Sequence, residues 1–70
     1  MTDINKIVSD NIRKFRLEKK ITQEGLALES GLHRAYIGQV ERNEKNIGLS
    51  NLQIIAKTLK VDLKDFLDEN

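Results

Sequence analysis

The sequence predicts an all-α fold, a compact domain of five helices. Apolar residues recur at helical spacing along the whole chain, and no segment suggests a strand. There is no proline, so helices can run wherever this spacing allows. The 70 residues are 39% apolar and 33% charged, a composition that suits a helical domain better than a disordered chain. We therefore expect a single domain over residues 1–70, too small to enclose an active-site cavity beside its core.

The first two helices are indicated by an apolar stripe and by residues suited to helix ends. Val8, Ile12 and Phe15 follow the spacing i, i+4, i+7 and predict a helix over residues 4–19. Thr22 can cap the next helix, because its hydroxyl can accept from backbone N–H groups left free at a helix start. Gly31 ends that helix, since a residue without a Cβ takes the left-handed conformation without steric cost.

Three further helices complete the prediction. The third buries apolar residues up to Val40 and stops at Asn43, which tolerates the left-handed conformation best among residues other than glycine. Within it, Gly38 should cost about 0.5–1 kcal/mol against alanine, which suggests a close approach to the second helix or to a ligand. Ser50 opens the fourth helix, and Asp62 caps a last, short one. The apolar residues of these two helices are Leu52, Ile55, Ala56, Leu59, Leu63, Phe66 and Leu67.

Several classes of protein are disfavoured by what the sequence lacks. There is no cysteine, which excludes disulfides and thiolate metal sites and fits a reducing cytoplasm. His33 is the single histidine and supplies no ligand set, so we expect no metal and no cofactor. No stretch approaches the roughly 20 apolar residues of a membrane span, and no signal peptide is recognisable. An enzyme is disfavoured by the small size and by carboxylates too scattered for an acid–base pair.

The second and third helices, joined by a short turn containing Gly31, form the arrangement called a helix-turn-helix. The residues that carry a wider resemblance are Thr22-Gln23-Glu24, Leu26-Ala27, Gly31, Ile37, Val40-Glu41-Arg42-Asn43, Ile47, Leu49, Leu52, Ile55-Ala56, Leu59-Lys60-Val61 and Leu63. Through them the chain resembles the Cro and phage-repressor type of helix-turn-helix regulators over residues 12–67. Among short chains of this type, it is similar to the controller proteins of restriction–modification systems.

This resemblance implies that the third helix enters the major groove of double-stranded DNA, where each base pair shows a distinct pattern of donors and acceptors. Arg34, Ala35 and Gln39 match the family's base-reading positions. Arg34 can pair with O6 and N7 of guanine, Gln39 with N6 and N7 of adenine, and Ala35 can touch a thymine methyl group. Guanine should therefore be among the specified bases.

Other residues of the same region are expected at the DNA backbone. Gln23 matches a family position whose amide binds a phosphate at the start of the second helix. The full set of expected backbone contacts is Gln23, His33, Tyr36, Arg42, Asn43, Lys45 and Asn46. Alternatives stay open, since Arg34 and Lys45 could be ordinary solvated charges, and the Tyr36 ring could pack against the core edge. A net charge of only +1 requires any basic surface to be local.

The resemblance also implies an ion pair, a dimer and a second protein contact. Arg16 and Glu41 match a pair that joins the first helix to the end of the third. Residues 47–70 are the expected homodimer region, because the second and third helices are committed to DNA. The candidate interface residues are Ile47, Ile54 and Phe66, and scattered exposed apolar residues are the alternative. Glu24 matches a position that some phage repressors use to touch RNA polymerase, but we prefer its interpretation as a charge favourable to a helix start.

These observations favour a transcription regulator that binds, as a dimer, an inverted-repeat operator with half-sites about one helical turn apart. Repression and activation both remain open. The alternative is an antitoxin-like or other protein-interaction module on the same helical fold, which the basic and amide side chains Arg34 and Gln39 disfavour.

Overall fold

The computed structural model describes residues 3–69, and every regular element within them is helical. In chain order the elements are α1 (Ile4–Glu18), α2 (Gln23–Ser30), α3 (Arg34–Glu41), α4 (Leu49–Leu59) and a 3₁₀ helix (Leu63–Leu67). The predicted all-α fold is confirmed for these residues, and the prediction of five helices holds in part, because the last element is a 3₁₀ helix and the other four are α-helices. Five residues are too few to form a stable α-helix, and the tighter 3₁₀ helix is common in segments of this length. Both ends of the expected 1–70 domain, residues 1–2 and 70, lie outside the described residues.

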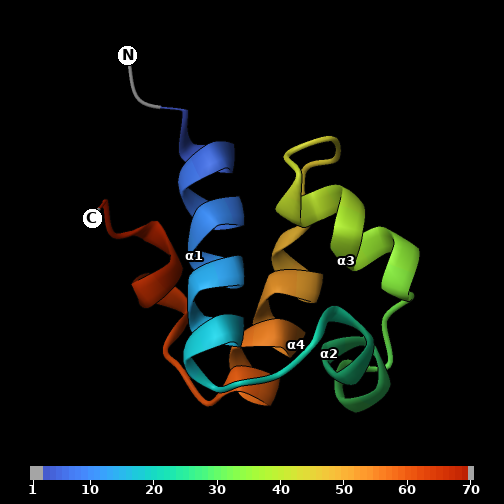
Figure 1. Cartoon of the computed structure of the whole chain (residues 1–70). Helices are drawn as coiled ribbons and strands as arrows, with labels where there is room; N and C mark the ends of the chain where they lie inside the picture. The colour runs from blue at the N-terminus through green and yellow to red at the C-terminus, as the bar shows by residue number, and fades with distance from the viewer. Residues whose placement is uncertain (1–2, 70) are drawn as a thin grey trace.

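Three of the other elements pack directly on α1 (Figure 1). It packs against α3 and α4, and the 3₁₀ helix, drawn in red, lies along its opposite side. The helix α2 packs against α3 and α4. The α2–α3 pair therefore stands at the edge of the molecule away from the C-terminal segment.

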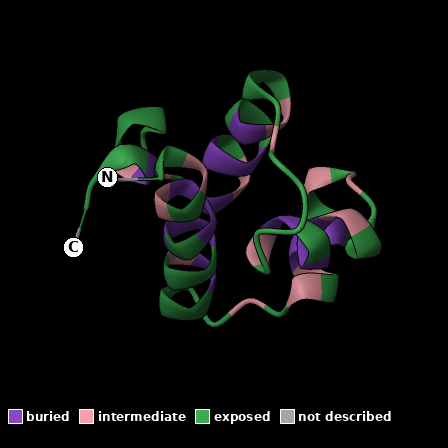
Figure 2. Ribbon diagram, turned by 90° about the horizontal axis from the view of Figure 1, so that it is seen from above, coloured by how far each residue is buried: buried purple, intermediate pink, exposed green. Residues whose placement is uncertain are grey.

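The helices meet in one apolar core, and Figure 2 shows their buried residues on the sides that face one another. The buried core residues are Val8, Ile12, Leu26, Ala27, Ile37, Val40, Leu52, Ile55, Ala56, Leu59 and Phe66. Most of the apolar residues expected from helical spacing are among them, whereas Phe15 is partly buried and Leu63 and Leu67 are exposed. Packing at this shared core, more than helix propensity, holds elements as short as α2 and α3 in place.

Phe66 lies inside this core and is not a dimer-interface residue, so that prediction is wrong. The residue exposes 0% of its surface, and its ring meets the Phe15 ring edge-on with centroids 5.5 Å apart. Burying an aromatic ring is the largest apolar gain available to so short a helix, so the ring turns inward. The segment is also tied to α1, because the Asn11 side-chain amide donates to the carbonyl oxygens of Phe66 and Asp68, both at 2.8 Å.

The ends of the helices follow the expected residues closely. The Thr22 hydroxyl accepts from the Gly25 backbone N–H at 2.9 Å and caps α2. Gly31 ends α2 with φ of 78°, and Asn43 follows α3 with φ of 59°, both in the left-handed region as predicted. The helix α4 begins at Leu49, one residue before the predicted Ser50, because Gly48 takes the extended cap conformation.

Candidate nucleic-acid interface

The outer face of α3 gathers the three side chains expected to contact bases. Ile37 and Val40 fix the opposite face of α3 on the core, so that Arg34, Ala35 and Gln39 are exposed. An open hollow on this face is lined by Gln23, Arg34, Ala35, Gly38, Gln39 and Arg42. The structure therefore places all three candidate base-reading residues around one hollow, together with two of the candidate backbone contacts.

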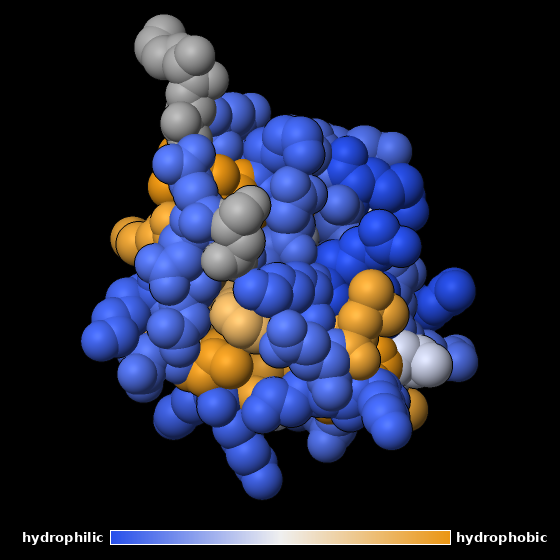
Figure 3. All heavy atoms as spheres, turned by 60° about the vertical axis from the view of Figure 1, so that its left-hand side comes forward, coloured by the Kyte–Doolittle hydropathy of each residue, from blue (hydrophilic) through white to orange (hydrophobic). Residues whose placement is uncertain are grey.

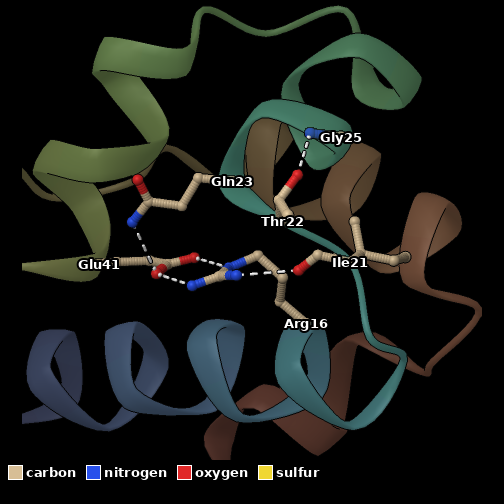
Figure 4. Close-up of polar contacts among 6 residues, drawn as sticks. All are labelled: Arg16, Ile21, Thr22, Gln23, Gly25 and Glu41. Atoms are coloured by element: carbon tan, nitrogen blue, oxygen red, sulfur yellow. Dashed lines mark hydrogen bonds and ion pairs between the residues drawn. The ribbon is translucent and has the colours of Figure 1, made fainter.

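The Gln23 side chain at the start of α2 is held by a buried polar network (Figure 4). Its Nε2 donates to Glu41 Oε1 at 3.1 Å. Glu41 in turn accepts from Nε and Nη2 of Arg16 at 2.7 and 2.9 Å, and Arg16 Nη1 donates to the Ile21 carbonyl at 2.9 Å. The side chains of Arg16 and Glu41 are only 9% and 2% exposed. The expected ion pair between α1 and the end of α3 is confirmed, and it also orients Gln23.

Gly38 lies inside α3 where two polar side chains approach the helix backbone. A Cβ at this position would lie 3.0 Å from Arg42 Nη1 and 3.6 Å from Gln23 Oε1. The first distance is too short for a comfortable contact, so alanine here would push the Arg42 guanidinium outward. The close approach expected at Gly38 is therefore made by side chains of α2 and of the residue that follows α3.

Arg42 is paired with Glu44 in an arrangement that the sequence did not indicate. Its Nε and Nη2 donate to the two carboxylate oxygens of Glu44 at 2.9 and 3.1 Å. Both side chains are more than half exposed. These hydrogen bonds hold the pKa of Glu44 below its ordinary value and raise the pKa of Arg42. The residues are two apart and lie beyond the helix, where the rule for i, i+3 and i, i+4 pairs gives no signal.

The loop after α3 places Lys45 and Asn46 at the surface, as their expected role requires. Lys45 Nζ lies 5.7 Å from the centre of the Tyr36 ring, a cation–π contact. The ring itself packs against the core, and its hydroxyl accepts from Asn51 Nδ2 at 3.1 Å. Two placements were expected for Tyr36, either packed against the edge of the core or in contact with the DNA backbone, and the structure has the ring packed against the core. Its contact with a DNA backbone stays a prediction.

His33 and Asn43 flank α3 and have different surroundings. His33 is exposed and caps α3 through its backbone conformation, with no capping hydrogen bond from its side chain. Asn43 accepts at Oδ1 from the hydroxyl of buried Ser9 at 3.5 Å, a long contact that joins the loop to α1. Neither arrangement tests the expected backbone contacts.

Arg13 is a basic residue of this surface that sequence analysis missed. It is exposed on α1, and it lines a second open hollow together with Gln23, Glu41 and Arg42. Its position one helical turn before Arg16 was the available signal, because residues three apart share one side of a helix. The addition of Arg13 extends the candidate surface from α3 across the start of α2 to α1.

The candidate dimer residues outside the core differ in exposure. Ile54 exposes 38% of its surface, whereas Ile47 is half-buried against the core. The other exposed large apolar residues of the described chain are Ile4, Leu17, Leu28, Leu49, Leu63 and Leu67. Figure 3, which brings the side of α1 and the C-terminal segment forward, shows separate apolar patches within a mostly hydrophilic surface. Nothing in this arrangement selects one patch as an interface.

Metal and membrane sites are not indicated by the described part of the chain. Residues 3–69 contain no group of three or more His, Cys, Asp or Glu side chains placed to hold a metal ion. No helix among them has the length and apolar character needed to cross a bilayer.

Comparison with known proteins agrees with this geometry. The chain is 48% identical over 65 residues to control protein C.SmaI of Serratia marcescens, a match that covers 93% of this chain and 77% of that protein. The crystal structure of hypothetical transcription factor NHTF from Neisseria superposes with a TM-score of 0.90 at 39% identity, covering 94% of this chain and 76% of that one. The restriction–modification controller protein C.AhdI from Aeromonas hydrophila superposes with a TM-score of 0.84 at 34% identity, covering 89% of this chain and 94% of that one.

A helix-turn-helix family model matches residues 12–66, which include α2, α3, α4 and the buried pair that joins α1 to α3. This span is nearly the same as the one that carries the resemblance in the sequence. The chain therefore belongs to this helix-turn-helix family.

Proposed function

We propose that this chain is a sequence-specific DNA-binding transcription regulator of the restriction–modification controller type, acting in the cytoplasm. The observation that carries the proposal is the outer face of α3, where Arg34, Ala35 and Gln39 are exposed around one hollow on a helix whose other face is buried. An exposed helix with a basic and an amide side chain at its start and middle suits the major groove. The similarity to control and controller proteins supports the same function.

Base recognition is assigned to the first two turns of α3. Arg34 would pair with a guanine and Gln39 with an adenine, while Ala35 leaves room for a thymine methyl group. Within the described residues, neither the Arg34 nor the Gln39 side chain makes a hydrogen bond to the protein that would have to break before DNA binds. Their exposure and common face support the assignment.

The backbone contacts surround this face. Gln23 is held at the start of α2, where free N–H groups favour a phosphate. Lys45 and Asn46 extend from the following loop, and Arg13 adds a positive charge beside Gln23. The proposed set is completed by Arg42, which lines the same hollow, and by three residues on or next to α3 in the chain, His33, Tyr36 and Asn43. The phosphates would thus fix the register in which α3 meets the bases.

The proposed active form is a homodimer that uses residues 47–70 and an operator with inverted-repeat symmetry. Ile54 on α4 remains the main interface candidate, because it lies off the buried stripe of Leu52, Ile55 and Leu59 and is apolar where a polar residue would be expected. Ile47 is a weaker candidate, since much of its surface already packs on the core. Dimerisation doubles the number of DNA contacts, which a chain of this size needs for tight binding.

A protein contact is proposed for α2, on the observation that Glu24 and Leu28 are exposed one turn apart and that Leu28 exposes 81% of its surface. Such a surface suits RNA polymerase in an activator, or another protein partner in an antitoxin-like module. Glu24 is also simply a favourable charge at a helix start. Glu24→Gln should keep operator affinity, and loss of stimulated transcription would assign this face to polymerase.

Selection of bound fragments from a random pool of DNA duplexes tests the main proposal. The purified protein should recover one inverted-repeat sequence, with half-site centres about 34–36 Å apart. Recovery of unrelated sequences with no shared motif would contradict a sequence-specific regulator and would favour the protein-interaction module.

A further inference from the structure

The Arg42 guanidinium and the Gln23 amide converge on Gly38. A Cβ on Gly38 would lie within 3.0 Å of Arg42 Nη1 and 3.6 Å of Gln23 Oε1. Both side chains line the hollow on the outer face of α3 as well as the hollow beside Arg13. A phosphate bound by Gln23 would therefore lie within reach of the Arg42 guanidinium.

Glu44 already occupies one edge of that guanidinium. It accepts hydrogen bonds from Nε and Nη2 of Arg42, at 2.9 and 3.1 Å. A guanidinium binds a carboxylate and a phosphate through the same planar fork of N–H donors. Arg42 Nη1, the donor atom beside Gly38 and Gln23, is left for a phosphate, but the Glu44 carboxylate balances the charge of the guanidinium that this phosphate would meet.

The Arg42–Glu44 pair has no evident role in holding the fold. Its two residues lie within the same turn of chain, and more than half of each side chain is exposed. Exposed pairs of this kind stabilise a fold little. The Arg16–Glu41 pair is the opposite case, since it is buried and joins two helices.

We propose that Glu44 lowers the affinity of this surface for DNA phosphates, because it balances the charge of Arg42 beside Gln23. The inference rests on the proposed DNA-binding function. Binding to DNA of arbitrary sequence depends almost wholly on phosphate contacts, so occupying one arginine weakens that binding.

Four proteins measured on a labelled duplex of scrambled sequence test this inference: wild type, Glu44→Gln, Arg42→Ala and the double variant. Glu44→Gln should bind about two- to fivefold more tightly at about 0.1 M salt, as expected for release of an exposed pair. The slope of log affinity against log salt should steepen by about one, because one more phosphate is neutralised. In the Arg42→Ala background the same substitution should have little effect.

Asp10→Asn is the matched control. Asp10 forms an exposed pair with Lys6 at 2.8 Å on α1, so the control removes one paired carboxylate and changes the net charge equally. It should leave both the affinity and the salt slope nearly unchanged. An equal gain in Asp10→Asn and Glu44→Gln, or an equal gain with and without Arg42, would overturn the inference in favour of a general charge effect.

Gly38→Ala provides a second, independent variant. Its methyl group would displace Arg42 Nη1 from the hollow. The affinity for the duplex should therefore fall in the wild-type background and be unchanged in the Arg42→Ala background. Equal losses in both backgrounds would contradict the placement of Arg42. If wild type binds no duplex at all, the proposed function fails. If it binds and Glu44→Gln has no effect, this inference alone fails.

Discussion

Arg16 and Glu41 form a two-point ion pair that joins α1 to the last turn of α3, with N–O distances of 2.7 and 2.9 Å. Because the pair is nearly fully buried, neither charge can be solvated if its partner is removed. The same carboxylate holds the Gln23 amide. One ion pair thus fixes both the angle of α3 and the side chain proposed to bind a phosphate.

Glu41→Gln should destabilise the fold far more than Glu44→Gln. Removing one partner of a buried pair leaves an uncompensated charge, which costs up to about 3–5 kcal/mol in the free energy of unfolding. Glu44 pairs at the surface, so its substitution should shift the melting temperature little. Thermal melts of the two variants check this, and equal small shifts would contradict a structural role for the Arg16–Glu41 pair.

Arg34→Ala should lower specific affinity by about 1–3 kcal/mol and relax the preference at one base pair in each half-site. The reason is the loss of a side chain that can pair with two atoms of a guanine. Repeating the fragment selection with this variant gives the measurement. An unchanged sequence preference would remove Arg34 from the base-reading set.

Lys45→Ala should weaken binding to every sequence alike and reduce the salt slope by about one, because a phosphate contact carries no base information. Titrations of two unrelated duplexes at several salt concentrations give both quantities. Lys64→Ala is a suitable control, since Lys64 lies on the 3₁₀ helix away from the α2–α3 pair. A similar slope change in both variants would count against a specific role for Lys45.

Ile54→Asp should yield a folded monomer at micromolar concentration, because a charge placed at an apolar interface must be desolvated when two copies meet. Sedimentation measures the mass, and circular dichroism confirms the fold. Leu17→Asp is the control, as Leu17 is an exposed apolar residue near the end of α1. Unchanged dimer mass in Ile54→Asp would move the interface elsewhere, and a monomeric wild type would exclude the dimer.

Replacing Arg42 should raise the pKa of Glu44. The hydrogen bonds from Arg42 hold this pKa below its ordinary value in the wild type. A lowered folded-state pKa means that the pair's small stabilisation is present above the ordinary glutamate pKa and is lost as pH falls through the lowered one. NMR titration of the Glu44 carboxyl in wild type and Arg42→Ala measures the shift, and the same pKa in both proteins would show that the pair is absent in solution.

Residues suited to helix ends made most of the fold predictable from sequence. Thr22, Gly31 and Asn43 mark ends that local chemistry determines, and the structure has all three in the expected conformation. Lys20 and Lys60 also take the left-handed conformation, with φ of 59°. Lysine has no preference for this conformation, so the sequence does not predict it at these positions. Both lysines follow a helix directly or closely, at Glu18 and Leu59, where a left-handed residue ends the helix.

The errors concern contacts between residues far apart in sequence. Apolar spacing over five residues could not decide which face of the last helix turns inward, so Phe66 was wrongly assigned to a dimer interface. The buried polar residues Ser9 and Asn11 were not expected in the core of α1, because their partners lie 34 to 57 residues away. Within the candidate site, the roles of Glu44 and Arg13 depend on their contacts with Arg42 and with the hollow beside Gln23, which are visible only in the folded chain.

The amide of Asn11 has a consequence for how the protein is made. It donates to the carbonyl oxygens of Phe66 and Asp68, so the first helix is synthesised long before these two acceptors exist. The Phe66 ring that closes the core arrives equally late. Until then the apolar stripe of α1 has no complete core to pack into, and exposed apolar surface of this kind makes a nascent chain prone to association. Translation therefore reaches nearly the last residues of this segment before the molecule can fold as a unit.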